Sequence, residues 1–155
     1  MSDLLIRPSG TRAPRSKTLA TWLALVGGSL GLHRFYLHGR AERWGWLFPL
    51  PTLVGAYGFW RMRTLGVEDA LGSALVPLLG AMVASTMLVA IVYGLMPDAR
   101  WNARWNAQAN QEPAMPPSGG LAIAGVIVAL AVGATVAMAT IAFCAQRYFE
   151  AQAPL

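Results

Sequence analysis

The two histidines of this 155-residue chain, His33 and His38, are the first candidates for chemistry, because imidazole is both an acid–base group and a metal ligand. They are five residues apart, and on a regular helix that spacing places them about 140° apart around the axis. Two metal ligands on one helix are typically four residues apart. The pair therefore predicts no metal or haem site within one chain, and we expect no cofactor.

Nucleophilic catalysis needs a serine or cysteine beside a base. The single cysteine, Cys144, lies more than 100 residues from either histidine, and the carboxylates fall in predicted loops. With one cysteine the chain cannot form an internal disulfide, and we expect Cys144 to pack as a small apolar residue near a helix end. The sequence therefore predicts no enzyme.

The distribution of the charged residues indicates the kind of elements that position these side chains. They make up only 12% of the chain, against about 25% in an average soluble domain. Four charge-free stretches together contain 85 residues, which is typical of an integral membrane protein and excludes a globular cytosolic enzyme, a disordered chain and a secreted disulfide scaffold. These stretches are residues 18–32, 44–60, 70–96 and 119–144.

This pattern predicts an all-α, polytopic helical membrane protein with about four transmembrane helices. The last two stretches reach about 40 Å at 1.5 Å per residue, which exceeds the ~30 Å hydrocarbon thickness. The first two are short and are interrupted by glycine or proline, so we expect a tight helical hairpin. We divide the chain into a basic cytoplasmic tail (1–16), the hairpin (17–63), a third transmembrane helix (70–96), a loop with an interfacial helix (97–118), a fourth transmembrane helix (119–147) and a C-terminal tail (148–155).

The net charge of +5 comes from basic residues that flank the apolar stretches. Such residues set topology and contact anionic lipid headgroups, so we expect the lipid bilayer as a partner and no nucleic acid. With the N-terminus inside, seven Lys and Arg residues fall inside and five outside. The excess predicts a multi-pass protein of the cell inner membrane with both termini cytoplasmic.

The last apolar stretch carries small residues at four-residue spacing. A row of this kind lies on one helical face and lets a partner backbone approach closely. Two alternatives stay open, namely packing inside the protein's own bundle and an interface with a second copy or a membrane-protein partner. The row consists of Gly125, Ala129, Gly133 and Ala137.

A tandem ARWN repeat follows the third stretch. On a helix this spacing places Trp101 over Trp105 and Arg100 over Arg104, and Asp98 is a candidate cap. Adjacent Trp and Arg ridges favour a helix that lies in the headgroup plane. The alternative is a docking face for another protein.

The segment KTLATWLALVGGSLGLHRFYLHG, residues 17–39, resembles the TM-two domain family, which is named for its two transmembrane segments. The resemblance is to bacterial members, here with a two-helix extension at the C-terminus. It implies a membrane hairpin and little chemistry. The residues that carry it are Lys17, Gly27, Gly28, Gly31, His33, Arg34, Phe35, Tyr36, Leu37 and Gly39.

The physical properties of this motif predict an interfacial anchor that closes the hairpin. Gly27 and Gly31 form a G-x-x-x-G row for close packing of the two short helices. We expect Arg34 to reach phosphate headgroups or the last helical carbonyls, the hydroxyl of Tyr36 to face water, and Gly39 to permit the turn. The alternative is a recognition site for a ligand or partner.

Taken together, these features predict a membrane protein that acts through contacts, as a structural, scaffold or accessory subunit. The alternative function is a small oligomeric channel or transporter. A proton-coupled carrier needs an ionisable group inside the membrane, and none of the four stretches contains one.

Overall fold

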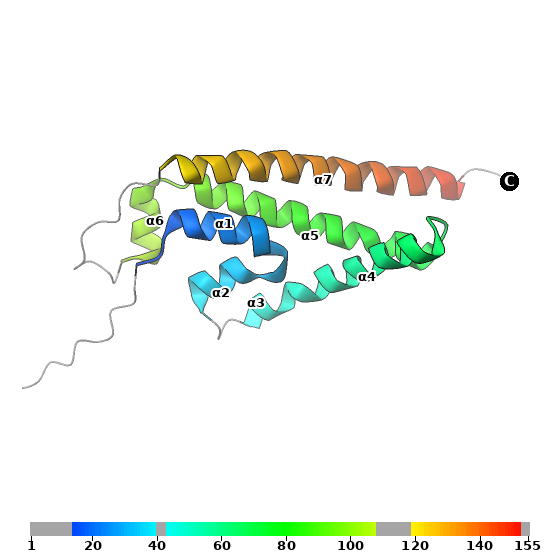
Figure 1. Cartoon of the computed structure of the whole chain (residues 1–155), viewed down its shortest axis with the longest axis horizontal. Helices are drawn as coiled ribbons and strands as arrows, with labels where there is room; N and C mark the ends of the chain where they lie inside the picture. The colour runs from blue at the N-terminus through cyan, green and yellow to red at the C-terminus, as the bar shows by residue number, and fades with distance from the viewer. Residues whose placement is uncertain (1–13, 40–42, 108–118, 153–155) are drawn as a thin grey trace, which may run out of the picture.

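The computed structural model describes residues 14–39, 43–107 and 119–152, and the part of the chain that it describes contains helices and no strand (Figure 1). The prediction of an all-α fold is therefore confirmed. The predictions for residues 1–13, 108–118 and 153–155 lie outside the described residues. In chain order the elements are α1 (Lys17–Gly27), the 3-10 turn η1 (Gly28–Leu30), α2 (Leu32–His38), α3 (Arg43–Leu47), α4 (Pro49–Leu65), α5 (Ala70–Leu95), α6 (Asp98–Trp105) and α7 (Gly120–Gln152).

The long helices α5 and α7 lie side by side in opposite directions (Figure 1). With 26 and 33 residues, they are the two described helices that are long and apolar enough to cross a membrane. This confirms the helices predicted for 70–96 and 119–147. However, α7 continues to Gln152, so the prediction of a tail from residue 148 is wrong for residues 148–152.

The outer surfaces of these two helices are covered with large apolar side chains. Leu88 and Leu95 on α5 and Ile127, Met138 and Ile141 on α7 are all exposed. Water-soluble proteins rarely expose such continuous apolar surface, whereas lipid tails are as apolar as leucine. The apolar surface and the two spans indicate a membrane protein.

Residues 17–63 fold differently from the predicted two-span hairpin. Helix α1 has 11 residues, or about 16 Å, and the chain then turns through η1 and through Gly31, which has a φ of 77°. Helix α2 returns along α1, and the backbone N–H of Ser16 donates to Oη of Tyr36 at 2.9 Å. The prediction of a single span over residues 18–32 is therefore wrong, because its glycine-rich end is a turn.

Helices α1 and α4 cover adjoining parts of α5. At the end of α1, Gly28 lies against Thr86, near the middle of α5. Toward the start of α5, Gly55 of α4 packs directly against Leu79, and Gly58 packs against Leu75. Each of these short helices thus packs along only part of the long helix.

The bundle has two distinct ends, which we call the α6 end and the turn end. At the α6 end, Nζ of Lys17 lies 2.6 Å from Oδ1 of Asp98, which brings the start of α1 to α6. At the turn end, Arg147 of α7 lies 3.8 Å from Glu68, in the turn between α4 and α5. The described chain therefore begins at the α6 end and ends at the turn end (Figure 1).

Candidate functional site

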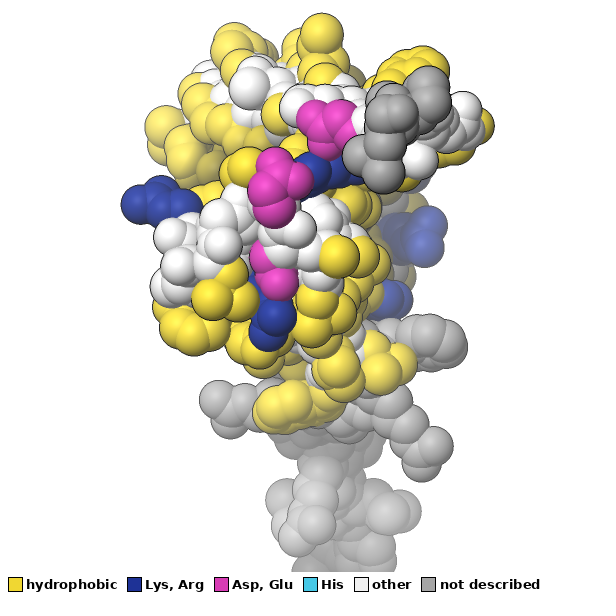
Figure 2. All heavy atoms as spheres, turned by 90° about the vertical axis from the view of Figure 1, so that its right-hand side faces the viewer, with side chains coloured by type: hydrophobic (Ala, Val, Ile, Leu, Met, Phe, Trp, Pro, Cys, Tyr) yellow, Lys and Arg dark blue, Asp and Glu magenta, His cyan; other side chains and the backbone are white. Residues whose placement is uncertain are grey.

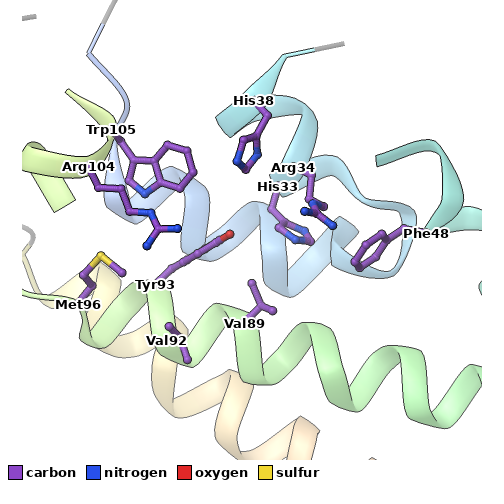
Figure 3. Close-up of a pocket in the computed structure, with 10 residues that line it drawn as sticks. All are labelled: His33, Arg34, His38, Phe48, Val89, Val92, Tyr93, Met96, Arg104 and Trp105. Carbon is purple, nitrogen blue, oxygen red and sulfur yellow. The ribbon is translucent and has the colours of Figure 1, made fainter. Parts of the chain in front are cut away.

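A cavity of about 420 Å³ lies at the α6 end, between α2, α5 and α6 (Figure 3). Its volume is within the range of about 300–1,000 Å³ that small-molecule sites occupy. In Figure 3 the side chains of His38, Tyr93 and Arg104 point toward a common space between the three helices. The polar and aromatic residues that line it are His33, Arg34, His38, Tyr93, Arg104 and Trp105.

His33 forms the buried floor of this cavity. Only 2% of its surface is exposed, and its ring meets the edges of Phe48 and Tyr93 at centroid distances of 5.8 and 6.0 Å. Burial, then the charges of Arg34 and His38, lowers the pKa of His33 to about 4, so its imidazole is neutral near pH 7. Its Nδ1 has no hydrogen-bond partner among the described residues.

Helix α6 forms one wall and lies across the end of the bundle (Figure 1). The rings of Trp101 and Trp105 are 6.0 Å apart, as the four-residue spacing predicts. Trp105 also contacts the ring of His38 at 4.9 Å, and the guanidinium carbon of Arg104 lies 5.5 Å from its centroid. The indole Nε1 of Trp105 is buried with no partner among the described residues.

Trp101 attaches α6 to the rest of the protein. Its side chain is buried with Ala20 and Leu37, and its Nε1 donates to the carbonyl oxygen of Arg15 at 2.8 Å. This side of α6 therefore packs against α1 and α2 of the same chain, and the two alternatives for the ARWN repeat, a helix in the headgroup plane and a docking face for another protein, stay predictions. Arg100 is exposed on the same helix.

Asp98 does not cap α6 as predicted. The N-cap is Pro97 and makes no side-chain hydrogen bond, while the carboxylate of Asp98 pairs with Lys17. Lys17 also donates from Nζ to the carbonyl oxygen of Met96 at 2.9 Å. The lysine therefore joins the start of α1 to both the end of α5 and the start of α6.

The His-Arg-Phe-Tyr motif lies on α2, and its side chains contact different parts of the protein. The guanidinium carbon of Arg34 lies 5.3 Å from the ring centroid of Phe48, and Phe35 meets the edge of Trp46 at 5.3 Å. The hydroxyl of Tyr36 accepts from a backbone N–H, so the prediction that it faces water is wrong. Gly39 ends α2 with a φ of 85°, as predicted for the turn.

The three glycines of the motif, Gly27, Gly28 and Gly31, each contact a different part of the protein. Gly27 ends α1 and contacts the side chain of Leu32, whereas Gly28 lies against Thr86 of α5. Gly31 is in the left-handed conformation, and a Cβ there would lie 2.7 Å from the carbonyl oxygen of Gly45. A single G-x-x-x-G helix face is therefore a wrong prediction, because α1 ends before Gly31.

The small-residue row of α7 packs inside the bundle. Ala129 is fully buried, Gly125 lies against Thr21 of α1, and Gly133 lies against Met87 of α5. Ala137, the last of the row, is partly buried. Of the two alternatives for this row, the structure favours internal packing.

The turn end contains ion pairs that sequence reasoning missed. Arg61 donates from Nε and Nη2 to the two carboxylate oxygens of Asp69 at 2.6 and 2.9 Å. Asp69 also caps α5 by accepting from the backbone N–H of Gly72 at 2.7 Å. The hydrogen bond from Arg61 is the main reason why the pKa of Asp69 lies below its usual value. The sequence signal that could have predicted this cap is an Asp directly before the apolar stretch, where its carboxylate can accept from the backbone N–H three residues later.

Cys144 lies in the C-terminal part of α7, as expected for a position near a helix end, but it is exposed and does not pack against the described residues as predicted. No group of three or more His, Cys, Asp or Glu that could hold a metal ion occurs within the described residues. His33 and His38 line the same cavity without such a third ligand.

The comparisons with known proteins concern the N-terminal third of the chain. Residues 13–63 match the family model of the TM2 domain. The match supports the resemblance to the TM2 family for this segment, and it leaves α5, α6 and α7 uncovered. Searches of curated proteins and of solved structures gave no significant match.

Proposed function

We propose that this protein is a non-enzymatic structural, scaffold or accessory subunit of a membrane, and that it acts through protein and lipid contacts. The observation that carries the proposal is the division of α7 into two faces. Its small residues are used inside the bundle, and its large apolar residues point outward.

The two faces differ in side-chain size as well as exposure. Ala129 and Gly133 are buried against the neighbouring helices. Ile127, Met138 and Ile141 lie on the outer face, where Met138 is 71% exposed. A face of this composition meets either lipid or another apolar helix, since both remove the same side chains from water. It thus supplies a contact surface that the protein's own fold does not use.

We place the protein in a bacterial-type inner membrane, and the charges support an orientation for the bundle. The described basic residues at the α6 end include Arg15, Lys17, Arg100 and Arg104, and cytoplasmic segments carry an excess of Lys and Arg. The α6 end is therefore the cytoplasmic end. Because α7 ends at the turn end, the C-terminus is on the opposite side. In this view α5 and α7 form the two-helix extension of a multi-pass TM2 protein, and α6 lies at the interface.

Reporter fusions test this orientation. A reporter that is active only outside the cytoplasm is expected to give signal when fused after Leu155, and a reporter active only inside is expected to give none. The reverse result would place the C-terminus in the cytoplasm and contradict this orientation.

Site-specific photo-crosslinking in native membranes tests the contact function. A photoreactive residue at Met138 or Ile127 is expected to give discrete protein adducts, because both side chains point away from the bundle. The same probe at Ala129, which is fully buried, is the matched control and is expected to give intramolecular adducts. Mass spectrometry identifies the neighbour.

Two results would contradict the proposal. One is the absence of protein adducts at every outward position of α5 and α7. The other is solute or ion flux in proteoliposomes that contain the purified protein alone, which would favour the channel or transporter alternative.

A further inference from the structure

We propose that the cavity at the α6 end binds a phosphate group, with a phospholipid headgroup or free phosphate as the source. The cavity joins the His-Arg-Phe-Tyr motif of α2 to the ARWN repeat of α6. This goes beyond the contact function proposed above, because it assigns a ligand to a defined set of side chains. It does not depend on a protein neighbour.

The first observation is a pair of buried polar atoms that lack partners. Nδ1 of His33 and Nε1 of Trp105 are both buried without a hydrogen-bond partner among the described residues, and both residues line this cavity. A buried polar group without a partner is destabilising, so two in one cavity indicate a missing partner. An indole N–H only donates, and the partner must therefore be an acceptor.

The second observation is the positive charge of the walls. Arg34 comes from α2 and Arg104 from α6, and both line the cavity. No acidic residue is among the described residues that line it. Guanidinium groups bind phosphate in two-point contacts. His33 is neutral, and a neutral imidazole with its proton on Nδ1 also donates. Every one of these groups thus suits an anionic acceptor.

The third observation is the apolar side of the cavity. Phe48 and the α5 residues Val89, Val92 and Met96 also line it. His38 and Arg104 are exposed at the mouth, while His33 is buried at the floor. A molecule with a phosphate beside an apolar chain matches both halves, and this combination favours a lipid over phosphate alone.

The test uses the purified full-length protein in a neutral detergent, with dihexanoyl phosphatidic acid and inorganic phosphate as separate probes. Native mass spectrometry and the thermal midpoint are measured against ligand concentration. Saturable binding is expected, with a rise in the midpoint. Tighter binding of the short-chain lipid identifies the lipid as the source, and equal binding identifies free phosphate.

Arg104→Gln is the main variant, and Arg100→Gln is its matched control. Both change one arginine on the same helix, but Arg100 does not line the cavity. Loss of a charge-assisted contact predicts affinity about 10-fold lower or weaker for Arg104→Gln, and less than about 2-fold lower for Arg100→Gln. Trp105→Phe keeps an aromatic side chain at this position but removes the indole N–H, so the affinity of this variant for the ligand is expected to fall about 3- to 10-fold.

Two outcomes would overturn the proposal. One is the absence of saturable binding of either probe to the wild-type protein. The other is an equal loss of affinity in Arg104→Gln and Arg100→Gln, which would indicate nonspecific electrostatic attraction to the protein surface. Circular dichroism confirms that each variant is folded, and Trp105→Phe provides the same test if Arg104→Gln does not fold.

Discussion

The two ends of the bundle treat their arginines differently. At the turn end, Arg61 is held by both carboxylate oxygens of Asp69, and Arg147 donates to Glu150 at 2.8 Å. Figure 2 views this end, where acidic and basic side chains lie next to one another among apolar groups. At the α6 end, Lys17 pairs with Asp98, while Arg34 and Arg104 line a cavity that has no acidic residue among its described lining residues.

Two cavities of the bundle also differ in the polarity of the residues that line them. A second cavity of about 390 Å³ lies between α5 and α7 and is lined by apolar groups such as Val83, Val136 and Phe143. The cavity at the α6 end has nearly the same volume but contains two arginines and two histidines. The comparison teaches that the turn end joins its arginines to carboxylates in ion pairs that serve stability, whereas the α6 end combines one ion pair with a polar cavity suited to a ligand.

The largest expected loss of stability is at the α6 end, where Trp101 attaches α6 to the bundle. Trp101→Ala removes a side chain that is 2% exposed, and large-to-small changes of this kind cost about 3–5 kcal/mol. Trp101→Phe keeps most of the packing and loses the bond to Arg15, at a cost of about 1 kcal/mol. Unfolding in detergent, followed by circular dichroism, measures both. Equal, small effects would show that α6 is not attached through Trp101.

The next effect tests the close packing of α4 on α5. Gly55→Leu would place a side chain where a Cβ already lies 2.7 Å from Cβ of Leu79, and overpacking costs about 1–3 kcal/mol. Gly120→Ala is the control, because nothing lies within 4 Å of its Cβ position. The thermal midpoint should fall for the first variant and stay nearly unchanged for the second. A stable Gly55→Leu variant would contradict this packing.

Gly31 and Gly39, which flank α2, allow backbone strain to be separated from steric crowding. Both Gly31 and Gly39 have positive φ, but a Cβ at Gly31 would lie 2.7 Å from the Gly45 carbonyl oxygen, and one at Gly39 would have nothing within 4 Å. Gly39→Ala should cost about 1–3 kcal/mol from backbone strain alone, because its φ of 85° and ψ of 173° belong to a region that essentially only glycine adopts. Gly31→Ala should cost more, as measured by chemical unfolding. The opposite order would rule out the close approach.

The smallest effect is expected at Asp69 and is pH-dependent. The pKa of Asp69 is lowered below 3.8 in the folded protein, so the stability from its ionised form is present above the unfolded pKa. It is lost as pH falls through the lowered value. Asp69→Asn keeps an N-cap residue and loses the charge pair with Arg61. The thermal midpoint of the variant should therefore be slightly lower at pH 7, and the difference should shrink toward pH 3.

A difference between wild type and Asp69→Asn that does not change with pH would show that the carboxylate charge contributes nothing. Asp69→Ala, which removes the cap as well, should lower the midpoint further than Asp69→Asn at pH 7.

The amino-acid sequence by itself determined the long helices and the membrane setting. Charge-free stretches of 26 residues or more have one stable solution in lipid, because only a helix satisfies every backbone group within one segment. The row from Gly125 to Ala137 also indicated a packing face correctly, since four-residue spacing is a local property of any helix. For the same reason Trp101 and Trp105 were correctly placed on one face.

Only the tertiary structure decided how the short apolar stretches are used. The break at Gly31 depends on a left-handed turn that the nearby Gly45 backbone crowds, and no local pattern distinguishes that glycine from one inside a packed helix. The contact of His38 with Trp105 was equally hidden, because the two residues lie far apart in the chain and only the packing of their helices brings them to one cavity. The cavity at the α6 end is thus a product of long-range packing, which residue types and spacing do not encode.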